Sequence, residues 1–141
     1  MRRIFLDTCG ILALVNKRDS LHEKAQKVNE SLLLQNVRFL TTDYILAEVG
    51  NALAKNKRLA VRALKHLQES EDTEVVKITE ELLNEALKIY EKYADKEWGL
   101  TDVSSFAVMK KFKISEALTD DRHFEQIWIY HSAEIKIREV P

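Results

Sequence analysis

Four acidic residues of this 141-residue sequence stand where carboxylates from different segments could meet: Asp7, Glu48, Asp102 and Asp121. Asp7 and Asp121 each follow a short apolar run of the kind that forms a buried strand. Glu48 lies in an apolar helical stretch that carries too little charge for a solvated face, and Asp102 falls in the first turn of an expected helix. Carboxylates gathered in one crevice repel one another, so this pattern predicts that cations bind there.

The ions that best suit such hard oxygen ligands are Mg²⁺ and Mn²⁺. An ion of this kind binds substrate phosphates, activates water as a nucleophile and stabilises the leaving oxygen. The four acids therefore predict metal-assisted hydrolysis of a phosphodiester. The residues do not distinguish between the two metals.

Each acid also has a structural explanation when it is taken singly. Asp7 could cap the helix that follows it, and Asp102 could offset the dipole of its own helix. Asp120 and Asp121 form an ordinary turn sequence after a strand. Glu48 is the acid that such explanations fit least well, and the conjunction of all four carries the functional hypothesis.

Strands alternate with helices along the chain, which predicts one α/β domain covering residues 1–141. We expect a three-layer α/β/α sandwich around a mostly parallel sheet of four to five strands, with the ligand crevice at the carboxyl ends of the strands. The expected strands cover residues 3–6, 37–41, 74–78, 114–118 and 127–130. The first expected helix covers residues 8–15. Four others are expected to begin after the caps Ser20, Thr42 or Asp43, Thr79 and Thr101, and a further helix is expected to end near Ser70.

The charge balance is nearly neutral, with 22 basic and 23 acidic residues and a net charge of −1. Any nucleic acid must therefore be held by a local basic patch or through metal ions. The basic stretch Lys55-Asn56-Lys57-Arg58 is one candidate, although a solvated helix end explains it as well. Single Cys9 is interpreted as a small core residue, which fits a reducing compartment. No apolar run resembles a signal peptide or a membrane span, so we expect a cytoplasmic protein.

Four segments carry a resemblance to a known family, and they span residues 4 to 124. They are Ile4-Phe5-Leu6-Asp7-Thr8, Thr42-Asp43-Tyr44-Ile45-Leu46-Ala47-Glu48-Val49, Trp98-Gly99-Leu100-Thr101-Asp102-Val103-Ser104-Ser105-Phe106-Ala107-Val108-Met109 and Ala117-Leu118-Thr119-Asp120-Asp121-Arg122-His123-Phe124. Their order and content resemble the four motifs of PIN domains. Each segment alone is a weak signal, but the four together are specific.

The resemblance implies a PIN-like fold and a Mg²⁺-dependent endoribonuclease that cuts single-stranded RNA, as in VapC-type toxins of toxin–antitoxin pairs. It implies metal ligation by Asp7, Glu48, Asp102 and Asp121, where the spacing from Thr119 favours Asp121 over Asp120. The same likeness implies hydrogen-bonding roles for Thr8 and Ser105, and it implies a homodimer with a VapB-like antitoxin partner.

Other functions remain open alternatives. Arg122 and His123 adjoin the acids, where they could touch an RNA phosphate or simply occupy a surface turn. A phosphatase that uses Asp7 as a nucleophile would need an acid two residues later, where Cys9 stands. The remaining alternative is a PIN-like scaffold or RNA-binding protein without catalysis, against which the four intact acids argue.

Overall fold

A five-stranded parallel sheet forms the centre of the computed structural model, which describes residues 2–119 and 136–137. The strands lie in the order β3-β2-β1-β4-β5, and all four pairings are parallel. The order places β1 at the centre of the sheet. The strands are β1 (Arg3–Leu6), β2 (Arg38–Thr42), β3 (Thr73–Val76), β4 (Glu116–Leu118) and β5 (Lys136–Ile137).

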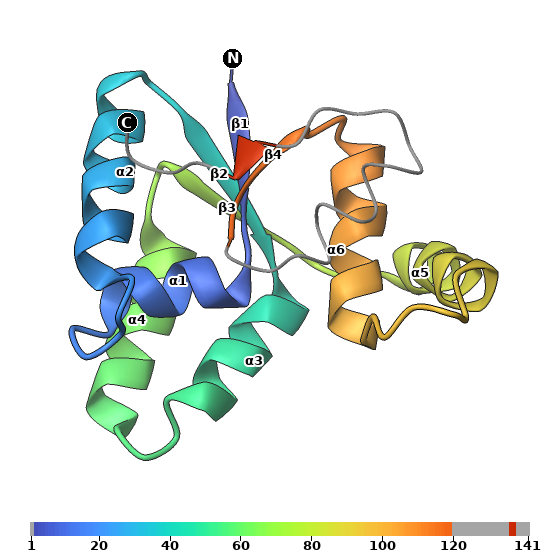
Figure 1. Ribbon diagram of the computed structural model, residues 1–141, viewed down its shortest axis with the longest axis horizontal. Helices are drawn as coiled ribbons and strands as arrows, with labels where there is room; N and C mark the ends of the chain where they lie inside the picture. The colour runs from blue at the N-terminus through green and yellow to red at the C-terminus, as the bar shows by residue number, and fades with distance from the viewer. Residues whose placement is uncertain (1, 120–135, 138–141) are drawn as a thin grey trace.

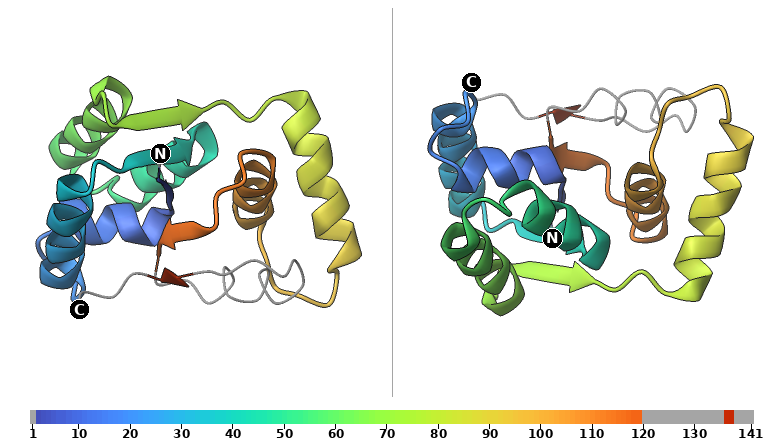
Figure 2. Two further views of the ribbon diagram at one scale, coloured as in Figure 1. Left: turned by 90° about the horizontal axis from the view of Figure 1, so that it is seen from above. Right: turned by 90° about the horizontal axis from the view of Figure 1, so that it is seen from below.

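Helices cover both faces of this sheet. Figures 1 and 2 show α1, α2 and α4 on one side, and α5 and α6 on the other. This arrangement confirms the predicted three-layer α/β/α sandwich. The helices are α1 (Thr8–Val15), α2 (His22–Leu34), α3 (Asp43–Ala52), α4 (Lys57–Glu69), α5 (Glu80–Lys92) and α6 (Leu100–Lys111).

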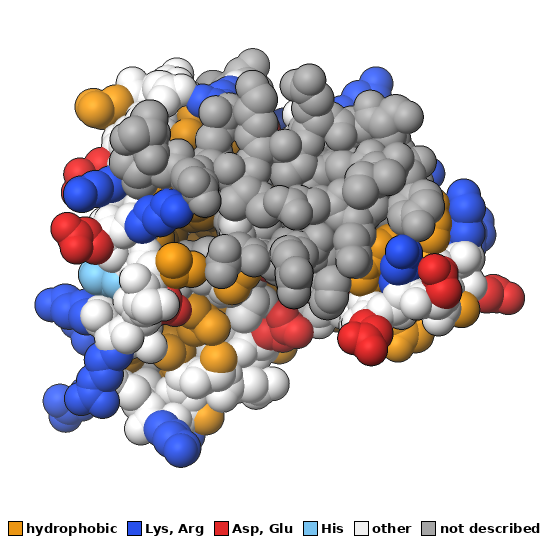
Figure 3. Space-filling model, viewed as in Figure 1, with side chains coloured by type: hydrophobic (Ala, Val, Ile, Leu, Met, Phe, Trp, Pro, Cys, Tyr) orange, Lys and Arg blue, Asp and Glu red, His pale blue; other side chains and the backbone are white. Residues whose placement is uncertain are grey.

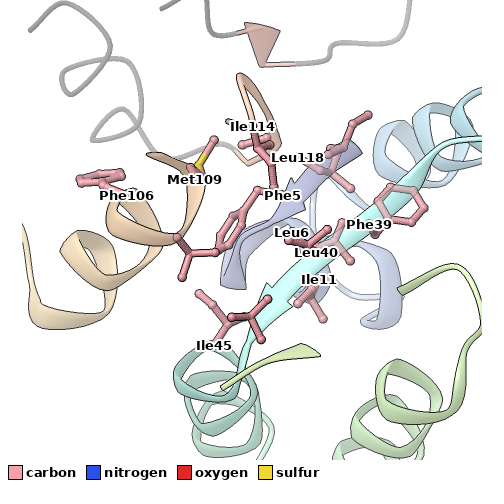
Figure 4. Close-up of a cluster of buried hydrophobic side chains, with 14 of the residues drawn as sticks. Phe5, Leu6, Ile11, Phe39, Leu40, Ile45, Phe106, Met109, Ile114 and Leu118 are labelled. Carbon is pink, nitrogen blue, oxygen red and sulfur yellow. The ribbon is translucent and has the colours of Figure 1, made fainter. Parts of the chain in front are cut away.

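The central strand is buried on both of its faces, which explains why its sequence is apolar without alternation. Ile4 and Phe5 have no exposed surface, and Leu6 is almost fully covered. Figure 4 shows Phe5 pointing toward α6, near Met109, whereas Ile11 comes from α1. Burial of these side chains fixes β1, and therefore fixes the residue that follows it.

Two predicted helix caps are wrong. Ser20 does not cap α2, because the Asp19 side chain accepts a hydrogen bond from the backbone N–H of Leu21 (2.9 Å) and the helix begins only at His22. Thr101 lies inside α6, whose N-cap residue is Gly99. The caps at Thr42 and Thr79 are confirmed, since each hydroxyl accepts from a backbone N–H of the first turn. The strand expected at residues 127–130 lies outside the described residues.

Gly10 allows the first turn of α1 to lie directly against the end of β4. A Cβ atom built on Gly10 would stand 2.1 Å from the carbonyl oxygen of Leu118. Real Cβ atoms do not approach backbone so closely, so only glycine permits this contact. The backbone N–H of Asp7 also donates to that carbonyl oxygen (3.4 Å). The close approach therefore places Asp7 beside Thr119, the residue that follows Leu118.

An ion pair joins Arg2, the residue before β1, to Glu116, the first residue of β4. The Arg2 guanidinium donates to both carboxylate oxygens of Glu116, at 3.0 and 2.6 Å. This hydrogen bonding raises the pKa of Arg2 above its ordinary value. The pair therefore fastens the two strands at the end opposite to Asp7. Among the helices of the described residues, none has the length and apolar character needed to cross a membrane.

Candidate active site

Asp7 lies at the carboxyl end of β1 with only 5% of its surface exposed. It occupies the N-cap position of α1, yet its side chain makes no capping hydrogen bond. Its Oδ2 atom instead accepts a hydrogen bond from the Thr119 hydroxyl (2.7 Å) and one from the Cys9 thiol (3.2 Å). Burial of a carboxylate costs free energy that a cap on the surface would not incur. The geometry therefore does not support the interpretation of Asp7 as a simple cap.

Thr119 and Cys9 are the two neighbours of Asp7 that the sequence analysis did not assign to the site. Thr119 is buried, and its Oγ1 atom lies 3.1 Å from the Cys9 Sγ atom. Cys9 is half-buried, so it lines the site and is not a plain core residue. The spacing of two residues between Asp7 and Cys9, at a strand end that leads into a helix, was the available signal.

Glu48 stands on the exposed face of α3. Its Oε1 atom accepts a hydrogen bond of 2.5 Å from the Thr8 hydroxyl. The helix begins beside the strand end because the Thr42 hydroxyl accepts from the backbone N–H of Ile45 (3.1 Å). Thr8 follows Asp7 directly in the chain, so it connects the segment that carries Asp7 to the second acid.

Asp102 lies in the first turn of α6, where its Oδ2 atom accepts from the backbone N–H of Gly99 (2.9 Å). This contact stabilises the start of the helix, as expected for an acid at that position. Ser105 is fully buried, and its hydroxyl donates to the carbonyl oxygen of Thr101 (3.0 Å). A role for Ser105 next to substrate or metal stays a prediction.

Helices α1, α3 and α6 all begin at the same edge of the sheet, at the bottom of Figure 1. The structure thus brings three of the predicted acids to one edge and connects Asp7 with Glu48 through Thr8. Within residues 2–119 and 136–137, no three His, Cys, Asp or Glu side chains form a group that could hold a metal ion. Asp120, Asp121, Arg122 and His123 lie outside the described residues, so the four-acid cluster stays a prediction.

Loss of the Thr119 hydroxyl is expected to weaken the site. In Thr119→Val the buried Asp7 carboxylate loses the hydrogen bond from the Thr119 hydroxyl, so we expect the free energy of unfolding to fall by about 1–3 kcal/mol. Thr119→Ser keeps the hydroxyl and serves as the control, because it should lose less stability than the valine variant. Thermal melts of the two variants check this, and equal losses would show that the hydroxyl does not stabilise Asp7.

The parallel α/β/α fold and the acids at one edge of its sheet are the features expected of a PIN domain, and comparison with known proteins supports this assignment. Residues 4–128 match the model of the PIN domain, so the chain belongs to the PIN domain family. A search of curated proteins gives no match.

Three solved structures that resemble this chain are VapC20, VapBC2 and FitAcB. VapC20 of Mycobacterium tuberculosis, described as a sarcin-ricin loop cleaving toxin, is 27% identical with a TM-score of 0.79, over 88% of this chain and 94% of that one. VapBC2 from Rickettsia felis, bound to a DNA fragment from their promoter, is 16% identical with a TM-score of 0.68, over 95% of this chain and 97% of that one. FitAcB from Neisseria gonorrhoeae is 19% identical with a TM-score of 0.63, over 94% of this chain and 95% of that one. The last two likenesses concern the fold alone.

Proposed function

We propose that this PIN chain is a metal-dependent endoribonuclease that hydrolyses phosphodiester bonds of single-stranded RNA. The observation that carries the proposal is the buried carboxylate of Asp7, which Thr119 holds at the end of β1 and which does not cap its helix. A fold gains nothing obvious from burying this charge, whereas an active site gains a fixed anionic oxygen. The likeness to VapC20, a toxin with a cleaving activity, supports the same conclusion.

The residues present fit Mg²⁺ or Mn²⁺, because carboxylate oxygens are the donors that these hard cations prefer. Asp7, Glu48 and Asp102 would hold the ion together with Asp121. When bound, such an ion lowers the pKa of water and neutralises charge on the phosphate. The chain itself supplies orientation, since Thr119 fixes the Asp7 carboxylate and Thr8 fixes that of Glu48. Arg122 and His123 are further candidates for contact with the phosphate.

Cleavage of RNA by the purified protein should require a divalent ion. We expect single-stranded RNA to be cut in Mg²⁺ or Mn²⁺, to leave 5′-phosphate ends, and to stay intact in excess EDTA. An Asp7→Asn preparation purified in parallel controls for contaminating nucleases. Undiminished cutting in EDTA would eliminate the metal mechanism, and no cutting with either ion would favour a scaffold role.

We further propose that the chain is the toxin of a toxin–antitoxin pair and forms a homodimer, with a VapB-like antitoxin as its partner. The similarity of its fold to the VapBC2 and FitAcB complexes supports this proposal. A short neighbouring reading frame for a small DNA-binding protein, whose co-expression restores growth, is the expected finding. Growth that is unaffected by the chain alone would contradict a toxin, and light scattering of the purified protein checks the dimer.

A further inference from the structure

A groove lies between the end of α1, the loop that follows it, the end of α3, the loop after α3 and one face of α4 as far as His66. It encloses about 920 Å³, which is near the upper end of the range for ligand sites. Among the described residues, its charged lining consists of basic side chains without any Asp or Glu, and apolar side chains such as Val15 and Leu59 also line it. We call it the basic groove, and its basic residues are Lys17, Arg18, Lys55, Arg62 and His66.

The positive surface continues beyond the basic groove along α4. Lys57, Arg58 and Lys65 line the adjoining hollow of the surface together with Arg62, and Glu69 is the one acid among its described lining residues. Figure 3 shows blue side chains gathered at the lower left, over α4 and the loop after α1. Seven of the 22 Lys and Arg residues lie on this side of a chain whose net charge is −1. The gathering is therefore a local feature and not a consequence of a basic composition.

Ion pairs within the described residues do not explain these cations, although the Lys57 ammonium donates a hydrogen bond to the carbonyl oxygen of Ala54 (2.7 Å). Each ion pair that the described residues form involves other Lys or Arg residues. Lys57 and Arg58 occupy the first turn of α4, which contains no acid. That end of a helix carries the positive pole of the dipole, so cations there lower helix stability. The positive pole of the helix dipole and the side-chain cations both attract negative charge. This surface is therefore suited to bind an anion.

We propose that the basic groove binds the sugar–phosphate backbone of the RNA at a distance from the cleaved bond. The proposal rests on the proposed function, because one RNA strand would occupy both places. Helix α1 connects them, since it begins directly after Asp7 and ends at Val15 in the groove lining. Its eight residues rise about 12 Å. Flexible exposed cations suit contacts with phosphates that do not depend on base sequence.

Binding of RNA in EDTA tests the basic groove without any cleavage. The probe is a short fluorescein-labelled oligouridylate, and its anisotropy is measured at several salt concentrations. The variant Arg18→Gln/Lys55→Gln/Arg62→Gln removes three charges from the groove. The matched control, Lys88→Gln/Lys92→Gln/Lys110→Gln, removes three exposed cations from α5 and α6 on the other side of the sheet. Thermal melts establish that both variants are folded.

We expect the groove variant to bind the oligouridylate roughly tenfold or more weakly, with the slope of log affinity against log salt reduced by about 2. The control variant should lose much less. Equal losses in both variants, or none in the groove variant, would overturn the proposal. Binding of labelled oligoglutamate that matches RNA and depends on the same three cations would assign the groove to an acidic peptide instead.

The same variants separate this proposal from the nuclease proposal. If the unmodified chain binds RNA through the groove but does not cut it with Mg²⁺ or Mn²⁺, the proposal of RNA binding in the groove is supported and the nuclease proposal is wrong. If the chain cuts RNA and the groove variant cuts it with an unchanged KM, the nuclease proposal is supported and the proposal of RNA binding in the groove is wrong. When both proposals hold, the groove variant shows a raised KM and a nearly unchanged kcat.

Discussion

If Asp7 binds the metal as proposed, Asp7→Asn is expected to slow RNA cleavage about 100-fold or more. Loss of a residue that only supports a metal ligand costs about 10- to 100-fold, and loss of a ligand oxygen should cost more. The same substitution should raise the melting temperature of the metal-free protein. Asparagine nearly matches aspartate in shape, so packing around the site should hardly change. A gain in stability that accompanies a loss of activity is the pattern typical of a functional carboxylate.

The expected stabilisation follows from the burial of Asp7. Burial of an ionised carboxylate costs several kcal/mol, and the amide avoids that cost. The carboxylate also gains from the charge-assisted hydrogen bond that Thr119 donates, but this advantage over a neutral bond is only about 1 kcal/mol. The desolvation cost is therefore the larger effect. A net gain of about 1 kcal/mol would raise the melting temperature by roughly 3 °C in a chain of this length.

Thermal melts in EDTA and in Mg²⁺ or Mn²⁺, for both the unmodified chain and Asp7→Asn, measure these effects. With metal present the order should change, because the unmodified chain gains stability by binding the ion and the variant gains less. If Asp7→Asn melts lower in EDTA and cuts RNA at the original rate, Asp7 is a structural residue. The active site proposed above would then be wrong.

Gly10→Ala is expected to cause the largest loss of stability of any substitution proposed here. The new Cβ would stand 2.1 Å from the carbonyl oxygen of Leu118, so either α1 or β4 must move. Overpacking of this kind costs about 1–3 kcal/mol or more, and backbone cannot rotate away as a flexible side chain can. The movement would also separate Asp7 from Thr119, so activity should fall together with stability.

Gly50→Ala is the matched control for this substitution. Gly50 lies within α3, and its Cβ would meet only the end of the Leu64 side chain at 3.4 Å. Alanine favours a helix over glycine by about 0.5–1 kcal/mol, so this variant should be unchanged or more stable. Denaturant unfolding of both variants gives the comparison. Similar stability of Gly10→Ala and Gly50→Ala would show that α1 does not need its close approach to β4.

The fold followed from local patterns in the sequence. Short apolar runs without alternation indicated strands buried on both faces, and Phe5 within β1 shows that burial directly. Hydroxyl caps at Thr42 and Thr79 marked helix starts correctly. Ser20 and Thr101 did not, because the Asp19 carboxylate and the Gly99 backbone determine how those helices begin. A cap depends on the local path of the chain, which residue type alone does not specify.

The candidate site followed from the sequence only in part. Residue types and order placed Asp7 at a strand end, Asp102 at a helix start and Glu48 inside the helix after the second strand, and parallel strands bring their carboxyl ends to one edge. The sequence could not distinguish an acid that caps a helix from one that is buried for function. That difference depends on contacts with residues far along the chain: Thr119 for Asp7, and Thr8 for Glu48.

The sequence by itself therefore determined the class of this protein, because periodicity, acids after apolar runs and the order of short motifs can all be read along the chain without knowledge of its contacts. Only the tertiary structure decided how Asp7 is held and which cations gather around the groove. Gly10 and Leu118 meet across 108 positions of chain, and Lys17 lines the same groove as Lys55 although 38 positions separate the two. Contacts of this kind arise when helices pack on a sheet, and packing is a property of the whole chain.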